Sequence, residues 1–156
     1  MPSARWREQY DRVMRWHARI TEATVVDERH LDDLHAFLIC CHHLKDWLSA
    51  DPTLDGAVKR GAQELVRHDE WLRLSADLAN GSKHLVLNRW WTSGIAHLDK
   101  TEWAVELKSG PGFAIRETFD VPVVRGAHGE QVAITVADRC VAAWNAFLGE
   151  RTLLGP

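Results

Sequence analysis

The stretch DERHLDDLHAFLICCHHLKDWLSA, residues 27–50, decides the fold. Apolar side chains recur in it at every third or fourth position, which is the period of an α-helix with one buried face. Asp27 is a suitable N-cap for such a helix. The stretch therefore predicts one long helix. Its buried stripe consists of Leu31, Leu34, Phe37, Leu38, Cys41, Leu44 and Leu48.

Three further helical patterns flank this stretch. Before it, apolar side chains recur at helical spacing from Trp6 to Ile20. After it, Asp51-Pro52 predicts the start of a third helix, because Asp caps well and Pro suits the first helical position. A fourth pattern begins near Trp71, and Asn80-Gly81 predicts its end in a left-handed residue. Residues 1–87 are therefore predicted to form a helical bundle.

The pattern changes after Leu87 from helical to alternating. Residues 103–108 and 113–119 have strand period, and residues 121–124 and 131–134 flank a Gly-rich turn. We predict a small antiparallel β meander over residues 98–134, with Pro122 in an edge strand or at the start of a strand. Thr135 and Asp138 resemble a capping box that would start a last helix over residues 135–149.

A short sheet is marginal on its own, so it should pack on the bundle with the last helix. The prediction is a single domain over residues 1–156, mainly α within the α+β class.

Composition excludes several functional classes. The net charge is −3, so no overall positive field draws the chain to nucleic acid. Three cysteines, two of them adjacent, make a poor disulfide framework and indicate a reducing compartment. No apolar run is long enough to span a bilayer, and residues 1–10 do not resemble a signal peptide. We therefore expect a cytoplasmic protein without a membrane partner.

The eight tryptophans allow two interpretations. Most are expected to fill the core or its rim, because each carries a large apolar surface. The adjacent pair Trp90 and Trp91 is the exception to consider, since two neighbouring indoles can form a binding platform.

The long helix carries a cluster of polar residues. His42 and Asp46 are four residues apart, so they lie on the same side of a helix and could share a proton or a metal ion. No second His or carboxylate pair recurs at matching spacing on another helix, as bundle metal sites require. A hydrogen-bonded pair at the helix surface is the favoured interpretation. We predict no metal and no cofactor.

A second polar cluster is DLANGSKH, residues 77–84. It places an acid, an amide, a hydroxyl, an ammonium and an imidazole within one helix end and loop. Such groups can bind an anion or move a proton. Alternatively, Asn-Gly ends the helix and the basic residues complement its dipole.

The stretch CHHLKDW, residues 41–47, together with DLANGSKH resembles uncharacterised bacterial and phage proteins similar to the HEPN superfamily. The resemblance covers about residues 27–90. It implies a four-helix up-and-down bundle, often a homodimer, that binds or acts on RNA or nucleotides, frequently in toxin–antitoxin or phage-defence settings. Catalytic members use an Arg followed four to six residues later by a His. Upstream of His84 the matching positions are Asp77, Leu78 and Ala79, so the guanidinium is missing.

We therefore predict a bundle that binds an anionic ligand, RNA or a nucleotide, or a protein partner, without efficient catalysis. The predicted ligand-binding residues are His42, Asp46, Asp77, Asn80, Lys83 and His84. One alternative is a metal-independent ribonuclease with His84 as its catalytic base. The other is a protein-interaction module that uses the β meander and the tryptophans as its contact surface.

Overall fold

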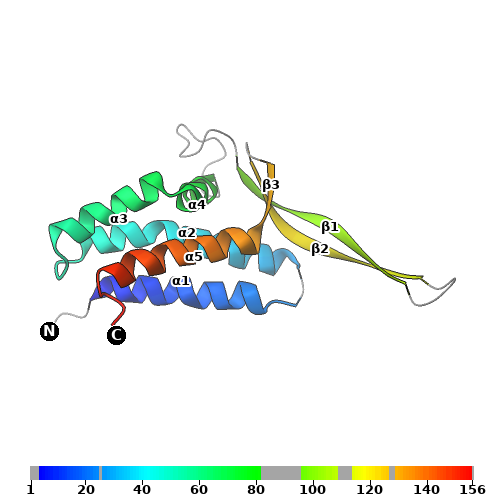
Figure 1. The fold of residues 1–156 in the computed structure, drawn as a ribbon, viewed down its shortest axis with the longest axis horizontal. Helices are drawn as coiled ribbons and strands as arrows, with labels where there is room; N and C mark the ends of the chain where they lie inside the picture. Colours follow the sequence, from blue (N-terminus) through cyan, green and yellow to red (C-terminus); the bar gives the residue numbers. More distant parts are fainter. Residues whose placement is uncertain (1–3, 25, 82–95, 109–113, 127–128, 156) are drawn as a thin grey trace.

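The computed structural model describes residues 4–24, 26–81, 96–108, 114–126 and 129–155 (Figure 1). The helices are α1 (Arg5–Glu22), α2 (Glu28–Ala50), α3 (Gly56–His68), α4 (Glu70–Gly81) and α5 (Ala133–Glu150). The strands are β1 (His97–Lys108), β2 (Ala114–Gly126) and β3 (Gly129–Val132). The predicted class, mainly helical with a small antiparallel sheet and a C-terminal helix, is confirmed.

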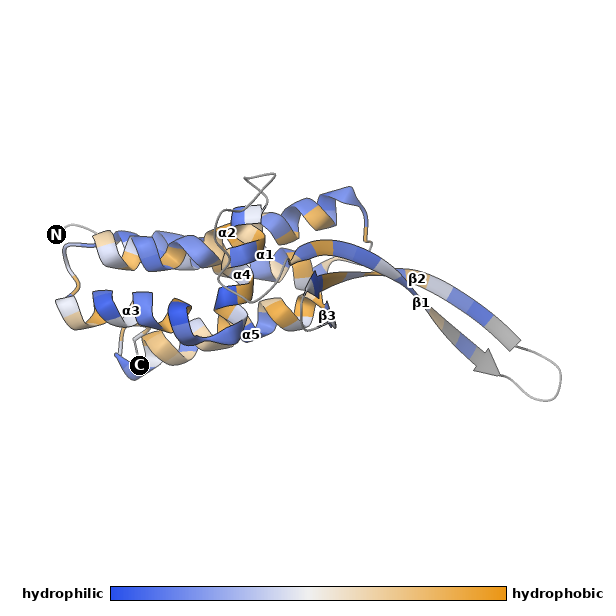
Figure 2. Ribbon diagram, turned by 90° about the horizontal axis from the view of Figure 1, so that it is seen from above, coloured by the Kyte–Doolittle hydropathy of each residue, from blue (hydrophilic) through white to orange (hydrophobic). Residues whose placement is uncertain are grey.

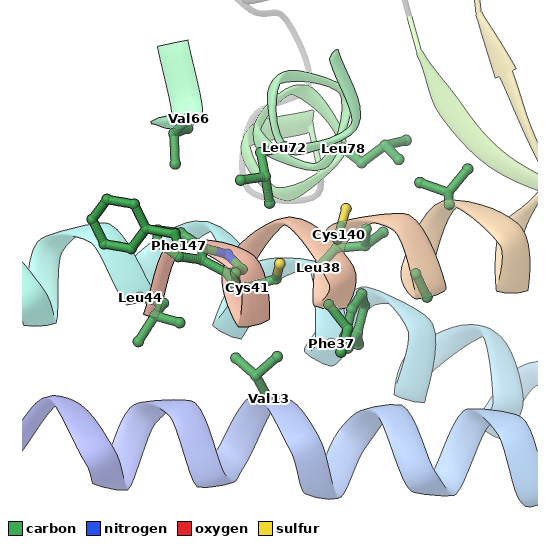
Figure 3. Packing of buried hydrophobic residues seen from close by; sticks show 14 of the residues in the cluster. Val13, Phe37, Leu38, Cys41, Leu44, Val66, Leu72, Leu78, Cys140 and Phe147 are labelled. Atoms are coloured by element: carbon green, nitrogen blue, oxygen red, sulfur yellow. The ribbon is translucent and has the colours of Figure 1, made fainter. Parts of the chain in front are cut away.

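Helix α2 is the centre of the helical part. It packs against α1, α3, α4 and α5. Helices α1, α2, α3 and α5 run lengthwise along the molecule, whereas α4 runs across α2 and α5 and is seen end-on in Figure 3. The predicted return of the last helix to the core is confirmed by the contacts of α5 with α1, α2 and α4.

The core forms where the apolar stripe of α2 meets its neighbours (Figure 3). Phe37, Cys41 and Leu44 of this stripe are fully buried. Trp6 and Trp144 are 1% and 0% exposed, so these two indoles fill the core as expected of most tryptophans. None of the helices that the structure describes is long and apolar enough to cross a membrane.

Aspartate side chains set the starts of three helices. Asp27 accepts a hydrogen bond from the backbone N–H of His30 at 3.0 Å, which confirms the predicted cap of α2. The predicted start of the third helix at Asp51 is wrong, because Asp51 ends α2 and Asp55 caps α3. Asp69 caps α4, accepting from the backbone N–H of Leu72 at 2.9 Å.

Two other predicted boundaries are also wrong. Helix α4 includes Gly81, whose backbone is not left-handed. Helix α5 begins at Ala133, and its N-cap Val132 makes no side-chain capping bond, so Thr135 and Asp138 do not form a capping box. Asp138 instead binds Nε2 of His17 on α1 at 2.7 Å, a tertiary contact that holds α5 against α1.

The three-stranded sheet has the order β1-β2-β3 and is antiparallel throughout. Strand β2 runs continuously through Pro122, where two separate strands were predicted. Pro122 lies one residue beyond the last β2–β3 pair, Val123 with Val132. The side of β2 that β3 covers therefore ends where proline stands, which is the edge environment that proline tolerates.

The β1–β2 ribbon projects from the end of the helices in both views (Figures 1 and 2). At its base Val123 and Val124 are buried, and Val124 belongs to the hydrophobic core. We call the projecting part, residues 102–108 and 114–120, the arm. Its pairs run from Glu102 with Asp120 to Lys108 with Ala114. The meander thus packs on the bundle at its base and extends away from it beyond.

Candidate functional site

The polar cluster of α2 is partly buried. His42 is 7% exposed and Lys45 is 8% exposed. The Lys45 ammonium donates to Asp46 Oδ1 at 2.6 Å, and His43 Nδ1 lies 3.3 Å from Asp46 Oδ2. The partners that the structure shows for Asp46 are thus neighbours on its own helix. A lysine at such low exposure needs this carboxylate, because an unpaired buried charge is costly.

The polar residues of α4 lie on a helix that packs directly against α2. Ser75 and Asp77 are fully buried, and Asn80 is half-buried. The Ser75 hydroxyl donates to the backbone carbonyl of Leu38 at 3.3 Å, which ties α4 to α2. Two packed helices therefore carry four of the predicted ligand-binding residues, namely His42, Asp46, Asp77 and Asn80.

The remaining predicted site residues, Lys83 and His84, lie outside the described residues, as does the pair Trp90 and Trp91. The convergence of the two polar clusters on one site therefore stays a prediction. Over the described ranges, no group of three or more His, Cys, Asp or Glu side chains could hold a metal ion. Burial lowers the pKa of His35 against the opposing charge of Asp32, so this imidazole is neutral at pH 7.

A groove of about 560 Å³ lies beside β2, where α1 ends and α2 begins. This volume is within the range of small-ligand sites, about 300–1,000 Å³. His30 lines it at 5% exposure, and its Nδ1 has no hydrogen-bond partner within the part of the chain described. Most other lining residues are apolar or carry a hydroxyl: Ile20, Thr21, Ala23, Thr24, Val26, Phe119, Val121, Pro122 and Ile134. Sequence reasoning missed this groove, because its walls come from segments far apart in the chain.

Among the side chains that the structure describes, two large apolar ones are exposed, and both belong to the arm. Trp103 is 46% exposed and Phe119 is 45% exposed. They face each other across β1 and β2 with ring centroids 6.4 Å apart in an edge-to-face arrangement. Phe119 also lines the groove, so the exposed apolar surface continues from the arm towards the bundle. The sequence predicted the alternation of β1, and one of its functional alternatives used the β meander and the tryptophans as a contact surface.

Polar groups occupy the alternate positions of the same ribbon. The Lys100 ammonium donates to Asp120 at 3.0 Å. This hydrogen bond and the charge of Asp120 raise the pKa of Lys100, because both favour the charged ammonium. Glu102, Glu106 and Arg116 are exposed as well. In β1 the charged residues Glu102 and Glu106 therefore alternate with Trp103, whereas in β2 Glu117 lies on the same face as Phe119.

No protein-family model matches the chain, and comparisons with curated proteins and with solved structures gave no match. The HEPN resemblance thus stays a prediction, and any functional conclusion comes from the residues of this chain.

Proposed function

We propose that the protein is an interaction module that binds a protein partner through the arm and the adjoining groove. The observation that carries this proposal is the exposed pair Trp103 and Phe119, which lies midway along the β1–β2 ribbon beside the groove. Aromatic side chains dominate the binding energy of many protein interfaces, because they bury large areas with few rotatable bonds. An exposed aromatic pair next to an apolar groove is the arrangement that a partner surface would cover.

The build of the arm supports the same proposal. A two-stranded ribbon is marginally stable in water unless other elements cover one of its faces. The base of the ribbon has that cover, since Val123 and Val124 are buried. The arm reaches beyond the helices, with Trp103 half-exposed (Figure 1). Binding a partner would provide the cover that the bundle gives to the base.

Site-specific photocrosslinking tests the proposal. Trp103 is replaced by p-benzoylphenylalanine in cells that express the full chain, and the matched control carries it at Thr118, an exposed arm residue at an alternate position. We expect covalent protein adducts from position 103 in clear excess over position 118. Equal yields from the two positions would refute the arm as a specific contact surface.

A second candidate function is binding of an anionic ligand, RNA or a nucleotide, at the face where α4 packs on α2. It is supported by the cationic or imidazole side chains of Lys45 and His42, which lie at low exposure on the helix that α4 packs against. The test is titration of the purified protein with a fluorescent RNA oligonucleotide and with ADP. Affinity that falls in Lys83→Ala and His84→Ala, but not in Lys59→Ala on α3, would support this function.

The ribonuclease alternative requires one further measurement on the same proteins. Cleavage of mixed RNA in the presence of a chelator, lost in His84→Ala, would assign His84 as a catalytic base. Intact RNA at high protein concentration would rule out this activity and leave the binding proposal to the titration.

A further inference from the structure

Strand β1 lies at the edge of the sheet. Within the described ranges β1 pairs with β2 alone, so the strand His97–Lys108 presents its other edge unpaired. An open edge of this length is a template for pairing with another strand, and most proteins cover or interrupt such edges. Proline and bulges are the usual interruptions, but residues 102–108 contain no proline and pair with β2 in unbroken register.

We propose that two copies of this chain pair their β1 strands antiparallel, about a two-fold axis through Val105, and so join two arms into one four-stranded sheet. This inference rests on the proposed role of the arm as a contact surface, and it names the partner as a second copy. A two-fold contact is self-complementary, because each strand offers the same residues to the other. Pairing over residues 102–108 spans about 24 Å of strand.

Charge complementarity selects the register. With the axis at Val105, the acidic position 102 lies opposite the basic position 108 of the second copy, twice per dimer. Residues directly opposite each other share one face of a sheet, and opposite charges there are favourable. Trp103 then lies opposite position 107, a leucine, and the two apolar sets fall on one face.

Neighbouring registers are less favourable. An axis at position 104 sets Glu102 opposite Glu106, and an axis at position 106 sets Glu106 opposite itself. Like charges directly opposite each other are destabilising. An axis at Trp103 also sets opposite charges against each other, Lys100 against Glu106, but Lys100 is already paired with Asp120. This axis also sets Asp99 opposite Leu107 and moves the contact towards the base of the ribbon.

The edge of β2 is a poorer candidate than that of β1. Strand β3 already covers residues 123–126 of β2. The alternate set of β2 that contains Phe119 also contains Glu117, which is exposed. The corresponding set of β1, positions 103, 105 and 107, is entirely apolar in sequence. Pairing through β1 therefore joins the apolar positions of β1 at the centre of the sheet, and the Glu117 residues opposite Val105 lie on the outer β2 strands.

Sedimentation velocity tests the register through its charges. The contact is small, so the expected Kd lies in the micromolar range and loading concentrations should span about 1–500 µM. Glu102→Lys and Lys108→Glu each turn two attractive contacts into repulsive ones, and each should weaken dimerisation about tenfold. The double variant, and an equimolar mixture of the two single variants, restore opposite charges and should dimerise like the wild type.

Within one copy, Glu102 lies opposite Asp120 and position 108 lies opposite Ala114, so neither residue has an oppositely charged residue directly across the ribbon. Circular dichroism should be unchanged in all variants. If the wild type dimerises but Glu102→Lys and Lys108→Glu dimerise equally well, the proposed register is overturned.

A disulfide test fixes the axis. In a Cys40→Ser background, Val105→Cys should give a covalent dimer with a mild oxidant, because two residues on the axis lie directly opposite each other. Ala104→Cys is the matched control, since position 104 lies opposite position 106 of the second copy. Linkage at 104 rather than at 105 would overturn the axis.

A wild type that stays monomeric at all concentrations would overturn self-pairing. The photocrosslinks from position 103 then separate the two proposals. Adducts with the mass of two chains support the second copy. Adducts of another mass retain the interaction module but refute self-pairing, and the absence of adducts refutes both.

Discussion

Replacing Asp51 tests how the end of α2 holds the start of α1. The Asp51 carboxylate is 3% exposed and accepts hydrogen bonds from the Thr53 hydroxyl at 2.6 Å and the Thr53 backbone N–H at 2.9 Å. It also accepts from the backbone N–H of Trp6 at 3.2 Å. Ala4, the N-cap of α1, makes no side-chain capping bond. Asp51 therefore acts as the cap of α1 from another helix.

The expected loss follows from these contacts. Removing a helix cap costs about 1 kcal/mol, and a buried donor left without an acceptor costs about 1–3 kcal/mol. Asp51→Ala leaves the N–H of Trp6 and the groups of Thr53 without their acceptor, so the free energy of unfolding should fall by about 2–4 kcal/mol. Asp51→Asn keeps one acceptor oxygen in place but loses the charge, and should cost about 1–2 kcal/mol.

The loss should also depend on pH. Burial would raise the pKa of Asp51, but hydrogen bonds from Thr53, Trp6 and Arg5 outweigh it and lower the pKa below the ordinary 3.8. A carboxyl with a lowered folded-state pKa stabilises the protein above its unfolded pKa. That stabilisation is lost as the pH falls through the folded value. The difference between wild type and Asp51→Asn should thus be complete at pH 7 and shrink below about pH 4.

Urea unfolding followed by circular dichroism at pH 7 and at pH 3 measures both effects. Asp55→Asn is the matched control, because Asn caps helices about as well as Asp and Asp55 caps α3 locally. It should change the free energy of unfolding by less than about 0.5 kcal/mol. If Asp51→Asn behaved like Asp55→Asn, or if its loss were the same at both pH values, the capping role of Asp51 would be refuted.

Two further predictions concern the helices. Gly149→Ala should raise the free energy of unfolding by about 0.5–1 kcal/mol, because a Cβ there meets nothing within 4 Å. Gly61→Ala should give no such gain, since its Cβ would lie 3.0 Å from Cε2 of Phe147. Thermal unfolding of the two variants measures both changes in stability. A hydrogen bond with Cys41 and complete burial raise the pKa of Cys140 well above its usual value. Iodoacetamide at pH 8 should therefore modify Cys140 only after unfolding, and peptide mass spectrometry measures this modification. Modification of Cys140 in the folded protein would contradict that burial.

The helices could be predicted from sequence because their signals are local. Periodicity and Asp27 were sufficient for α2, whose stripe and cap are as predicted. The third helix shows where local signals fail. Asp51 and Asp55 are equally good caps in sequence, and Asp51 also precedes a proline. The choice between them depends on the Trp6 N–H, which comes from a distant segment and engages Asp51.

The candidate sites were predictable only in part, for a related reason. Helical spacing predicted His42 and Asp46 on one side of α2, and the structure shows Asp46 paired with Lys45 and with His43. Spacing says which residues face the same way, whereas rotamers and burial decide which atoms meet. The groove beside β2 had no sequence signal, because His30 and Phe119 come from different elements.

The bundle and the arm differ in how their side chains are engaged. In the bundle, Lys45 donates to Asp46 and Ser75 donates to the carbonyl of Leu38, and the second of these bonds ties α4 to α2. The arm serves no such purpose, since Trp103 and Phe119 stay about half-exposed while their ribbon leaves the helices (Figure 2). An edge strand can avoid unwanted pairing by carrying charged side chains. This one keeps its charges at alternate positions and a tryptophan between them, which is the pattern of a strand that pairs with a specific partner and rejects wrong registers.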